Sequence, residues 1–426
     1  MNKISVVSKD DSSAKELKTE KLPFKDLIKR IGPGIILTGV VIGPGAITTA
    51  AMLGAQYGYS LIWILIPIAF MGMSFLLTTY RIALLTGLPS IHAIRHYYGS
   101  FAAKVVGIAT FLSCVFFTIG NISGTGAGMT MLFGINWKLG ALIMLFVLVY
   151  CYFSKGVYSK VEKVSMICIL GLILAFYATL VKTGGPNVNE LAHGFTNWSF
   201  PVGGLILALG FISTNASINT GLYGTYLSGE KKWKKEDLFN GAMVTDAIAH
   251  VVGVILVSGA IVLVGAIVLF PQQAIITSTT QMADMLVPFM GNAAKYIMGI
   301  ALLAAAFSSL LGNTHRSVVL LNAGFNKPTG LEEKSIRWGS LIVLAISAIV
   351  SFSYGGSPIQ LIYIANIATA VATPVAGIFI CLLLFRKDVN KGVKQPRILQ
   401  ICMVISYLFA VILTGFALYQ IIGNIF

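Results

Sequence analysis

Eleven segments of this chain are long and apolar enough to cross about 30 Å of hydrocarbon as helices, and this pattern constrains the fold most. They run near 31–58, 59–84, 105–136, 138–154, 161–182, 199–229, 240–270, 293–313, 336–354, 358–385 and 398–425. Only 11% of the residues are charged, whereas soluble domains carry about 25%. A chain this apolar requires lipid as its solvent. The sequence therefore predicts an all-α integral membrane protein whose partner is the lipid bilayer.

The positive charges alternate from one side of the predicted spans to the other. If the N-terminus is cytoplasmic, all but three of the 30 Lys and Arg residues fall on the cytoplasmic side, including Arg316 in a predicted inner loop. The exceptions are Lys138, Lys182 and Lys295. Cytoplasmic loops are enriched in Lys and Arg, so we expect a plasma-membrane protein with its C-terminus outside the cell. This distribution explains the net charge of +15 without a nucleic-acid partner.

The spans divide the chain into three predicted parts. Residues 1–30 form a polar cytoplasmic tail, and residues 31–386 form a transporter core of ten transmembrane helices. Residues 387–426 hold a cytoplasmic loop and an eleventh transmembrane helix. Within the core, we expect a first repeat near 31–182 and a second near 199–386. We expect the chain to be monomeric.

Two of the spans contain residues that do not suit a continuous helix. Span 31–58 carries Gly43, Pro44 and Gly45 at mid-membrane depth, and span 199–229 carries a polar run from Ser213 to Gly221. Proline and glycine weaken a helix, and short polar side chains compete for its backbone hydrogen bonds. Each broken span opens a group of five, and an odd number inverts the second group. The pattern predicts a 5+5 inverted repeat with discontinuous helices 1 and 6 and a midplane site; a proline kink with polar inter-helix contacts is the alternative.

Several short motifs resemble the Nramp family, whose members have the LeuT architecture. The motifs are GPG and IGPGA in the first span, AQYGYSLIW, MLFGI, KVEKV, Asp246 in the seventh span, and LLAAAFSS in the eighth. These motifs are spread along the chain, so the resemblance extends over most of its length. The resemblance implies a LeuT-like fold and a secondary transporter.

The residues that define the Nramp metal site are replaced in this chain. The Asp and Asn that ligate metal in the family correspond to Gly43 and Ala46, and the Met ligand corresponds to Ser217. The Asp and Glu linked to proton movement in the third span correspond to Thr118 and Asn121. A divalent cation needs anionic oxygen, nitrogen or sulfur ligands, and a proton carrier needs a group that titrates. The predicted site contains neither, so none of the family's metal ligands is retained.

A neutral pocket of this kind favours a different substrate. The start of the second half of span 1 would expose backbone N–H groups that bind a carboxylate, and aromatic faces attract substituted ammonium groups. The aromatic residues near the breaks are Phe116, Phe117, Phe211, Tyr223, Phe307 and Tyr363. We therefore expect a small zwitterionic or amine-containing solute such as glycine betaine or an amino acid. The expected substrate-binding residues are Gly43, Gly45, Ala46, Asn121, Phe211, Thr214, Ser217 and Asn219.

The resemblance to LeuT-like transporters also implies a coupling ion. A sodium ion would lie between carbonyl groups at Val41 and Ile42 and the hydroxyls of Ser308 and Ser309. The first expectation is thus a sodium-coupled symporter without a cofactor. The alternatives are an Nramp-like Mn²⁺ or Mg²⁺ transporter with an atypical neutral site, and a non-transporting sensor. An enzyme is not expected, because no catalytic Ser/His/Asp set or HExxH motif is present.

Overall fold

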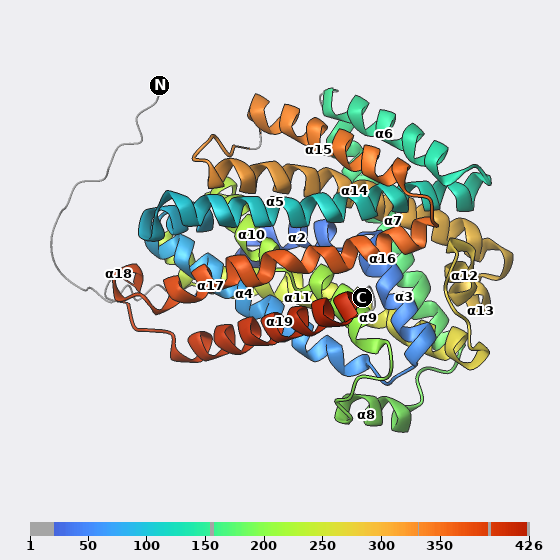
Figure 1. Cartoon of the computed structure of the whole chain (residues 1–426). Helices are drawn as coiled ribbons and strands as arrows, with labels where there is room; N and C mark the ends of the chain where they lie inside the picture. The colour runs from blue at the N-terminus through green and yellow to red at the C-terminus, as the bar shows by residue number, and fades with distance from the viewer. Residues whose placement is uncertain (1–20, 154–156, 331, 391–392, 424–426) are drawn as a thin grey trace.

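The computed structural model describes residues 21–153, 157–330, 332–390 and 393–423, and within these ranges the chain is a bundle of helices without β-strands (Figure 1). Most of the helices run roughly along one direction. The short helices α12 (Thr279–Ala283) and α13 (Val287–Met290) lie at one end of the bundle, and α18 (Lys387–Asn390) lies at the other. The long helices thus span the molecule from end to end.

Helices occur at each of the eleven predicted spans. In chain order these are α2 (Pro33–Val41) with α3 (Pro44–Tyr57), α4 (Leu65–Thr86), α5 (Ser90–Phe133), α6 (Trp137–Phe153), α7 (Val157–Lys182), α9 (Gly204–Asn215) with α10 (Ile218–Glu230), α11 (Ala242–Val264), α14 (Ala294–Gly324), α15 (Lys334–Ser353), α16 (Pro358–Ala368) with α17 (Ala372–Phe385), and α19 (Arg397–Gly423). The remaining α-helices are α1 (Phe24–Arg30) and α8 (Val188–Thr196). The shorter 3-10 or π turns are η1 (Ile62–Ile64), η2 (Lys235–Leu238), η3 (Gly265–Leu269), η4 (Phe270–Gln272), η5 (Asp284–Leu286), η6 (Gly291–Ala293) and η7 (Thr369–Val371).

The lengths of these helices suit a membrane. Among the described residues, up to nine units are long and apolar enough to cross one, with α2 and α3 counted as a single bent span. Shorter apolar helices are α6 and the Ile169–Lys182 part of α7. The chain is therefore a multi-pass membrane protein.

The first span breaks where glycine and proline predicted it. Helix α2 ends at Val41 and α3 begins at Pro44, with an angle of 61° between them. Pro44 has no N–H group to donate back to the preceding turn. Gly43 is extended, with φ −109° and ψ −176°, and its N–H donates to the carbonyl of Val41 over 2.8 Å. The helical ladder therefore stops for two residues in the middle of the bundle.

The second break lies in span 6. Helix α9 ends at Asn215 and α10 begins at Ile218. The side-chain amide of Asn215 donates to the carbonyl of Phe211 over 2.8 Å, and the hydroxyl of Ser217 accepts from the N–H of Asn219 over 3.3 Å. These side chains take over hydrogen bonds at the helix ends. The prediction of discontinuous helices 1 and 6 is confirmed.

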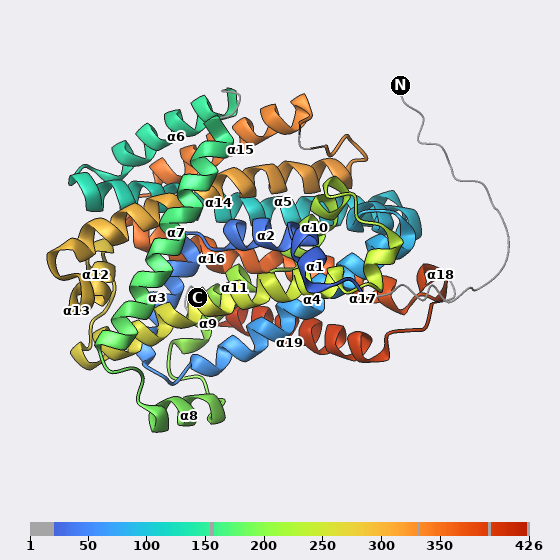
Figure 2. The same cartoon turned by 180° about the vertical axis from the view of Figure 1, so that it is seen from behind.

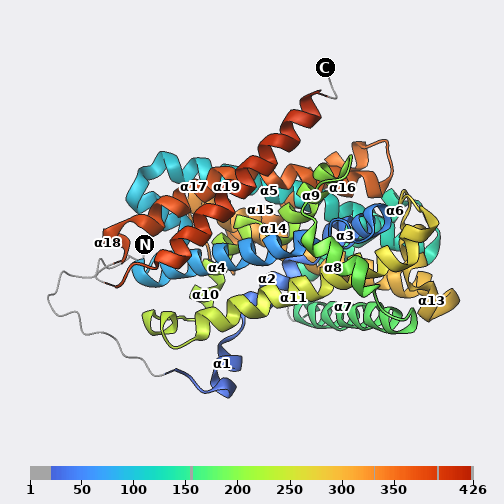
Figure 3. The same ribbon diagram turned by 90° about the horizontal axis from the view of Figure 1, so that it is seen from below.

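The broken helices are surrounded by the other spans. Helix α3 packs against α9, α11 and α16, while α2 packs against α11 and α14. From behind, α7 crosses the bundle beside α11 and α14 (Figure 2). From below, α19 lies on the outside next to α4 and α17 (Figure 3). Both breaks are thus enclosed by protein.

Helix α14 corrects one predicted boundary. We expected the eighth span to end near residue 313, but α14 continues to Gly324 and packs along α5. An added Cβ at Gly107 would lie only 2.8 Å from the Cα of Gly324, so the two backbones touch at this point. Arg316 therefore lies inside a packed helix and not in a cytoplasmic loop, and its side chain is 4% exposed.

Candidate functional site

The space beside the first break is filled by side chains of the protein. An added Cβ at Gly43 would lie 2.8 Å from Oδ1 of Asn121 and 2.8 Å from Oγ of Ser309. An added Cβ at Gly45 would lie 2.3 Å from Oδ1 of Asn366. A carbon atom is too large to sit this close to these atoms, so a larger residue at either position would force the side chains of Asn121, Ser309 or Asn366 to move. We expected these glycines to leave room for an organic solute, and the structure shows Asn121, Ser309 and Asn366 in that room.

Asn366 was not predicted as a site residue. It lies on α16, is fully buried, and neither atom of its side-chain amide has a hydrogen-bond partner. Its backbone carbonyl accepts from Ser213 on α9 over 2.8 Å. A buried amide without partners is costly, so it signals a ligand or a strained site. The sequence contains no signal for Asn366, because its neighbours along the chain are ordinary helix residues. Only its contact with Gly45 and its unpartnered amide, both seen in the structure, identify it as a site residue.

A small pocket of about 10 Å³, roughly the space of one water molecule, lies between the two breaks. Its lining residues are Val41, Ser113, Phe117, Ser213, Thr214, Ser217, Asn219, Arg316 and Thr369. Val41, Thr214, Ser217 and Asn219 were predicted as site residues, and the structure brings them together here. Gly43, Gly45, Ala46, Ile42 and Asn121 are buried in the neighbouring layer and do not line this pocket. Phe211 is 1% exposed and also lies outside the lining.

Asn219 connects the pocket to α5. Its side-chain N–H donates to the hydroxyl of Ser113 over 2.9 Å, while its Oδ1 has no partner. Oδ1 of Asn121, one helical layer away, is likewise buried without a partner. The amide N–H of Asn121 donates to Ser309 over 2.9 Å. Asn121, Asn219 and Asn366 therefore place three unpartnered amide oxygens around the breaks.

The pocket also contains a positive charge. A guanidinium nitrogen of Arg316 donates to Oδ1 of Asn313. Asn313 in turn donates to the hydroxyl of Thr118 and to the carbonyl of Cys114, both over 2.7 Å. The guanidinium carbon lies 5.7 Å from the ring centre of Phe117. One of the aromatic faces near the breaks therefore faces a cation of the protein itself, where an ammonium group of a substrate was expected.

The serines of α14 contact span 1 directly. The hydroxyl of Ser309 donates to the carbonyl of Val40 over 2.7 Å, one residue before the predicted carbonyl groups. An added Cβ at Gly39 would lie 3.6 Å from the hydroxyl oxygen of Ser308, which places Ser308 beside the residue before Val40. Ser308 and Ser309 thus face neighbouring residues in the same turn of α2. In this conformation Ser309 forms an inter-helix hydrogen bond.

Asp246 holds the N-terminal end of α2. Its carboxylate accepts from the N–H groups of Gly32 and Gly34 over 2.9–3.0 Å and from the hydroxyl of Tyr80 over 3.0 Å. One turn away, Nδ1 of His250 lies 2.9 Å from the hydroxyl of Thr38. A carboxylate at a helix N-terminus is stabilising because it meets free N–H groups and the positive end of the dipole. Asp246 therefore fastens α2 to α11 and does not reach the pocket.

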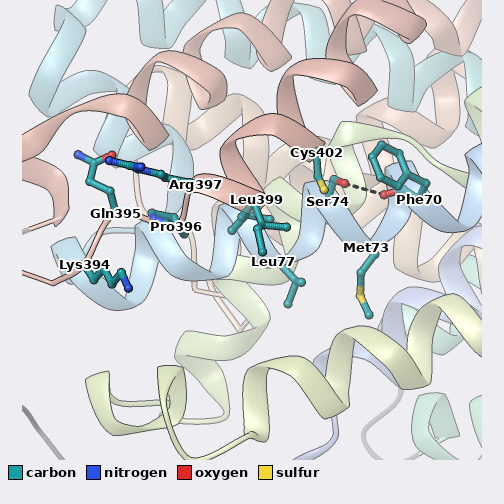
Figure 4. A pocket seen from close by; sticks show the side chains of 11 residues that line it. Phe70, Met73, Ser74, Leu77, Lys394, Gln395, Pro396, Arg397, Leu399 and Cys402 are labelled. Carbon is teal, nitrogen blue, oxygen red and sulfur yellow. Dashed lines mark hydrogen bonds between the residues drawn. The ribbon is translucent and has the colours of Figure 1, made fainter.

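A much larger cavity lies elsewhere in the described part of the chain. It measures about 940 Å³ and runs along the outside of the bundle between α4 and α19 (Figure 4). Phe70, Met73 and Leu77 line its apolar part, and Lys394 and Arg397 lie at one end. No residue of either break belongs to it. Its position beside the outermost helix makes it a lipid-facing groove and not the transport site.

Solved structures share this fold. A manganese transporter of Eremococcus coleocola, in complex with an aromatic bis-isothiourea substituted compound, superposes with a TM-score of 0.74 at 17% identity, covering 96% of this chain and 91% of that one. Mhp1, a nucleobase-cation-symport-1 family transporter, superposes with a TM-score of 0.58 at 13% identity, covering 92% and 93%. The LeuT-like inverted repeat with an eleventh helix is therefore the fold of this chain.

Curated relatives cover much of the sequence. The divalent metal cation transporter MntH of Agrobacterium fabrum is 24% identical over 75% of this chain and 71% of that protein. MntH of Brucella suis biovar 1 is 23% identical over 83% and 80%. MntH of Staphylococcus saprophyticus is 28% identical, but over 44% of this chain and 42% of that protein.

The expectation of a sodium-coupled symporter for betaine or an amino acid is wrong. The curated relatives are named as divalent metal cation transporters, and the room assumed for an organic solute beside Gly43 and Gly45 is occupied by side chains. The family model described as "Natural resistance-associated macrophage protein-like" matches residues 34–420. The chain therefore belongs to the Nramp family.

Proposed function

We propose that this chain is a secondary transporter, and not an enzyme, that carries a hard divalent cation such as Mn²⁺ or Mg²⁺ across the plasma membrane. Its membership of the Nramp family and the names of its relatives support this class of substrate. The cation would occupy the space between the two helix breaks, which is where LeuT-like folds place their substrate sites.

One observation carries this proposal. Oδ1 atoms of Asn121, Asn219 and Asn366 are buried around the breaks without hydrogen-bond partners. Hard cations bind carbonyl and amide oxygens as well as carboxylates and water. Ser217 and the carbonyl groups of the broken backbone add further neutral oxygens. These groups replace the Asp, Asn and Met ligands of the family by a set that contains only neutral side chains.

The neutral ligands determine which cation is favoured. Mg²⁺ loses its hydration water reluctantly and is commonly bound with several waters retained. Without a carboxylate, we expect weak binding, with a Kd of about 10⁻³ M or higher. Without a sulfur ligand, the site gives no advantage to soft metals. The transporter should therefore work on a cation that is abundant outside the cell.

The described lining of the pocket contains no carboxylate or imidazole. A proton relay needs such a group, so we expect transport driven by the gradient of the cation itself. Alternating access would move spans 1, 2, 6 and 7 against spans 3, 4, 8 and 9. The breaks at Gly43 and Ser217 supply the flexible points of the moving helices.

Uptake by proteoliposomes tests the proposal. Purified protein should admit Mn²⁺ and Mg²⁺ in a saturable manner, and a pH gradient of either sign should leave the rate unchanged. Asn219→Leu should lower the rate about tenfold or more, while Ser347→Ala, which alters a buried hydroxyl on α15 that does not line the pocket, should not. The proposal would be contradicted if neither Mn²⁺ nor Mg²⁺ showed saturable uptake.

A further inference from the structure

Arg316 is a buried charge that the proposed cation transport does not use. Its side chain lies in the pocket between the breaks and is 4% exposed. A guanidinium group keeps its positive charge under all physiological conditions. A buried charge is costly unless it is paired and hydrogen-bonded. The position of Arg316 therefore requires an explanation.

The partners of Arg316 are all neutral. A guanidinium nitrogen donates to the amide oxygen of Asn313, and the ring of Phe117 lies 5.7 Å from the guanidinium carbon. The Nε atom is buried and has no hydrogen-bond partner. In the part of the chain that the structure describes, no ion pair within 4.0 Å includes Arg316. One directed N–H group and one full charge are therefore left without a counterpart.

We propose that Arg316 forms an anion-binding subsite in this pocket, which takes a single-atom monovalent anion such as a halide. The guanidinium group is the side chain best suited to carboxylates and other anions. The hydroxyl of Ser217 lines the same pocket and accepts a hydrogen bond from Asn219, so its own hydrogen can be donated to the anion. A volume of about 10 Å³, roughly the space of one water molecule, restricts the ligand to a single-atom ion.

The anion subsite can exist whether or not the protein transports a cation. If it does transport one, a bound anion would reduce the electrostatic repulsion between Arg316 and the cation. A fixed positive charge in the same pocket repels a divalent cation. An anion bound to Arg316 cancels this charge and leaves the neutral oxygens free to bind the cation. If the proposed function holds, cation uptake should then depend on the anion present, and this second consequence rests on that function.

Anion binding to the purified protein tests the subsite independently of transport. Radiolabelled chloride and radiolabelled acetate are measured separately by equilibrium dialysis at constant ionic strength, which distinguishes a halide site from a carboxylate site. We expect saturable binding of chloride and not of acetate, loss of chloride binding in Arg316→Gln, and partial recovery in Arg316→Lys. Arg397→Gln removes an exposed arginine outside the pocket and should bind as the unaltered protein does.

Two results would overturn the proposal. One is the absence of saturable chloride binding to the unaltered protein, and this result needs no variant to fold. The other is binding that is equal in Arg316→Gln and in Arg397→Gln. If the anion binds but no divalent cation is transported, the subsite stands and the proposed function fails. If cations are transported at the same rate with chloride, acetate and an anion too large for the pocket, cation transport stands and the coupling to the anion fails.

Discussion

Single residues decide what the space between the breaks can hold. The side chains of Asn121, Ser309 and Asn366 approach the backbone of Gly43 and Gly45. The sequence suggested that these two glycines leave room for an organic substrate, and this interpretation is wrong. The sequence predicted Thr214, Ser217 and Asn219 as neighbours because they share one broken span. It did not predict Asn366 or Arg316, which come from other helices. A residue in an apolar run shows its role only when the facing helix is known.

Asn366→Leu separates stability from function at this site. Leucine is close in volume and removes a buried amide that has no partner, so we expect the free energy of unfolding to rise by about 1 kcal/mol. The same change removes a proposed cation ligand, so Mn²⁺ uptake should fall about tenfold. Thermal unfolding in detergent and uptake by proteoliposomes measure the two effects. Uptake equal to that of the unaltered protein would show that Asn366 does not bind the cation.

At the scale of elements, the two halves of span 1 are held in different ways. Helix α3 is enclosed by α9, α11 and α16. Helix α2 is fastened at its start by the carboxylate of Asp246, which accepts from Gly32 and Gly34 and lies on α11. The N-terminal turn of α2 is thus held to α11 by the hydrogen bonds of one carboxylate.

Asp246→Asn should loosen α2. The amide has no negative charge and one acceptor atom fewer, so the N–H groups of Gly32 and Gly34 lose charge-assisted hydrogen bonds of about 2 kcal/mol. Hydrogen–deuterium exchange in residues 32–38 should become faster, and the midpoint of thermal unfolding should fall. Asp388→Asn is the control, because Asp388 is exposed and pairs with Arg386 outside the bundle. Equal hydrogen–deuterium exchange rates in α2 of the two variants would show that the carboxylate of Asp246 does not hold this helix.

At the scale of the whole molecule, topology follows from helix count and charge. Helices stand at every predicted span, and Arg386, Lys387, Lys394 and Arg397 gather at the connection between α17 and α19. The placement of Arg316 inside α14 removes one charge from the predicted inner loops without changing the alternation of the others. We therefore keep the prediction of a cytoplasmic N-terminus and an extracellular C-terminus.

Reporter fusions measure this orientation. Alkaline phosphatase joined after residue 426 should be active in a bacterial host, because it folds only outside the cytoplasm, and green fluorescent protein joined at the same place should be dark. Fusions in the connection between α10 and α11, which contains Lys231, Lys232, Lys234 and Lys235, should give the opposite pair of results. A fluorescent C-terminal fusion would contradict the count of eleven spans.

The sequence by itself determined the helices, their number and the places where two of them break. These features follow from hydropathy, proline chemistry and local polar competition, which act over a few consecutive residues. Only the tertiary structure decided which side chains meet at the breaks, because α5, α14 and α16 bring their residues there from distant parts of the chain. Packing filled the apparent space at Gly43 and Gly45 with amides and placed Arg316 in the pocket. The physical reason is that apolar runs in lipid specify a span, whereas the identity of a site depends on contacts between spans.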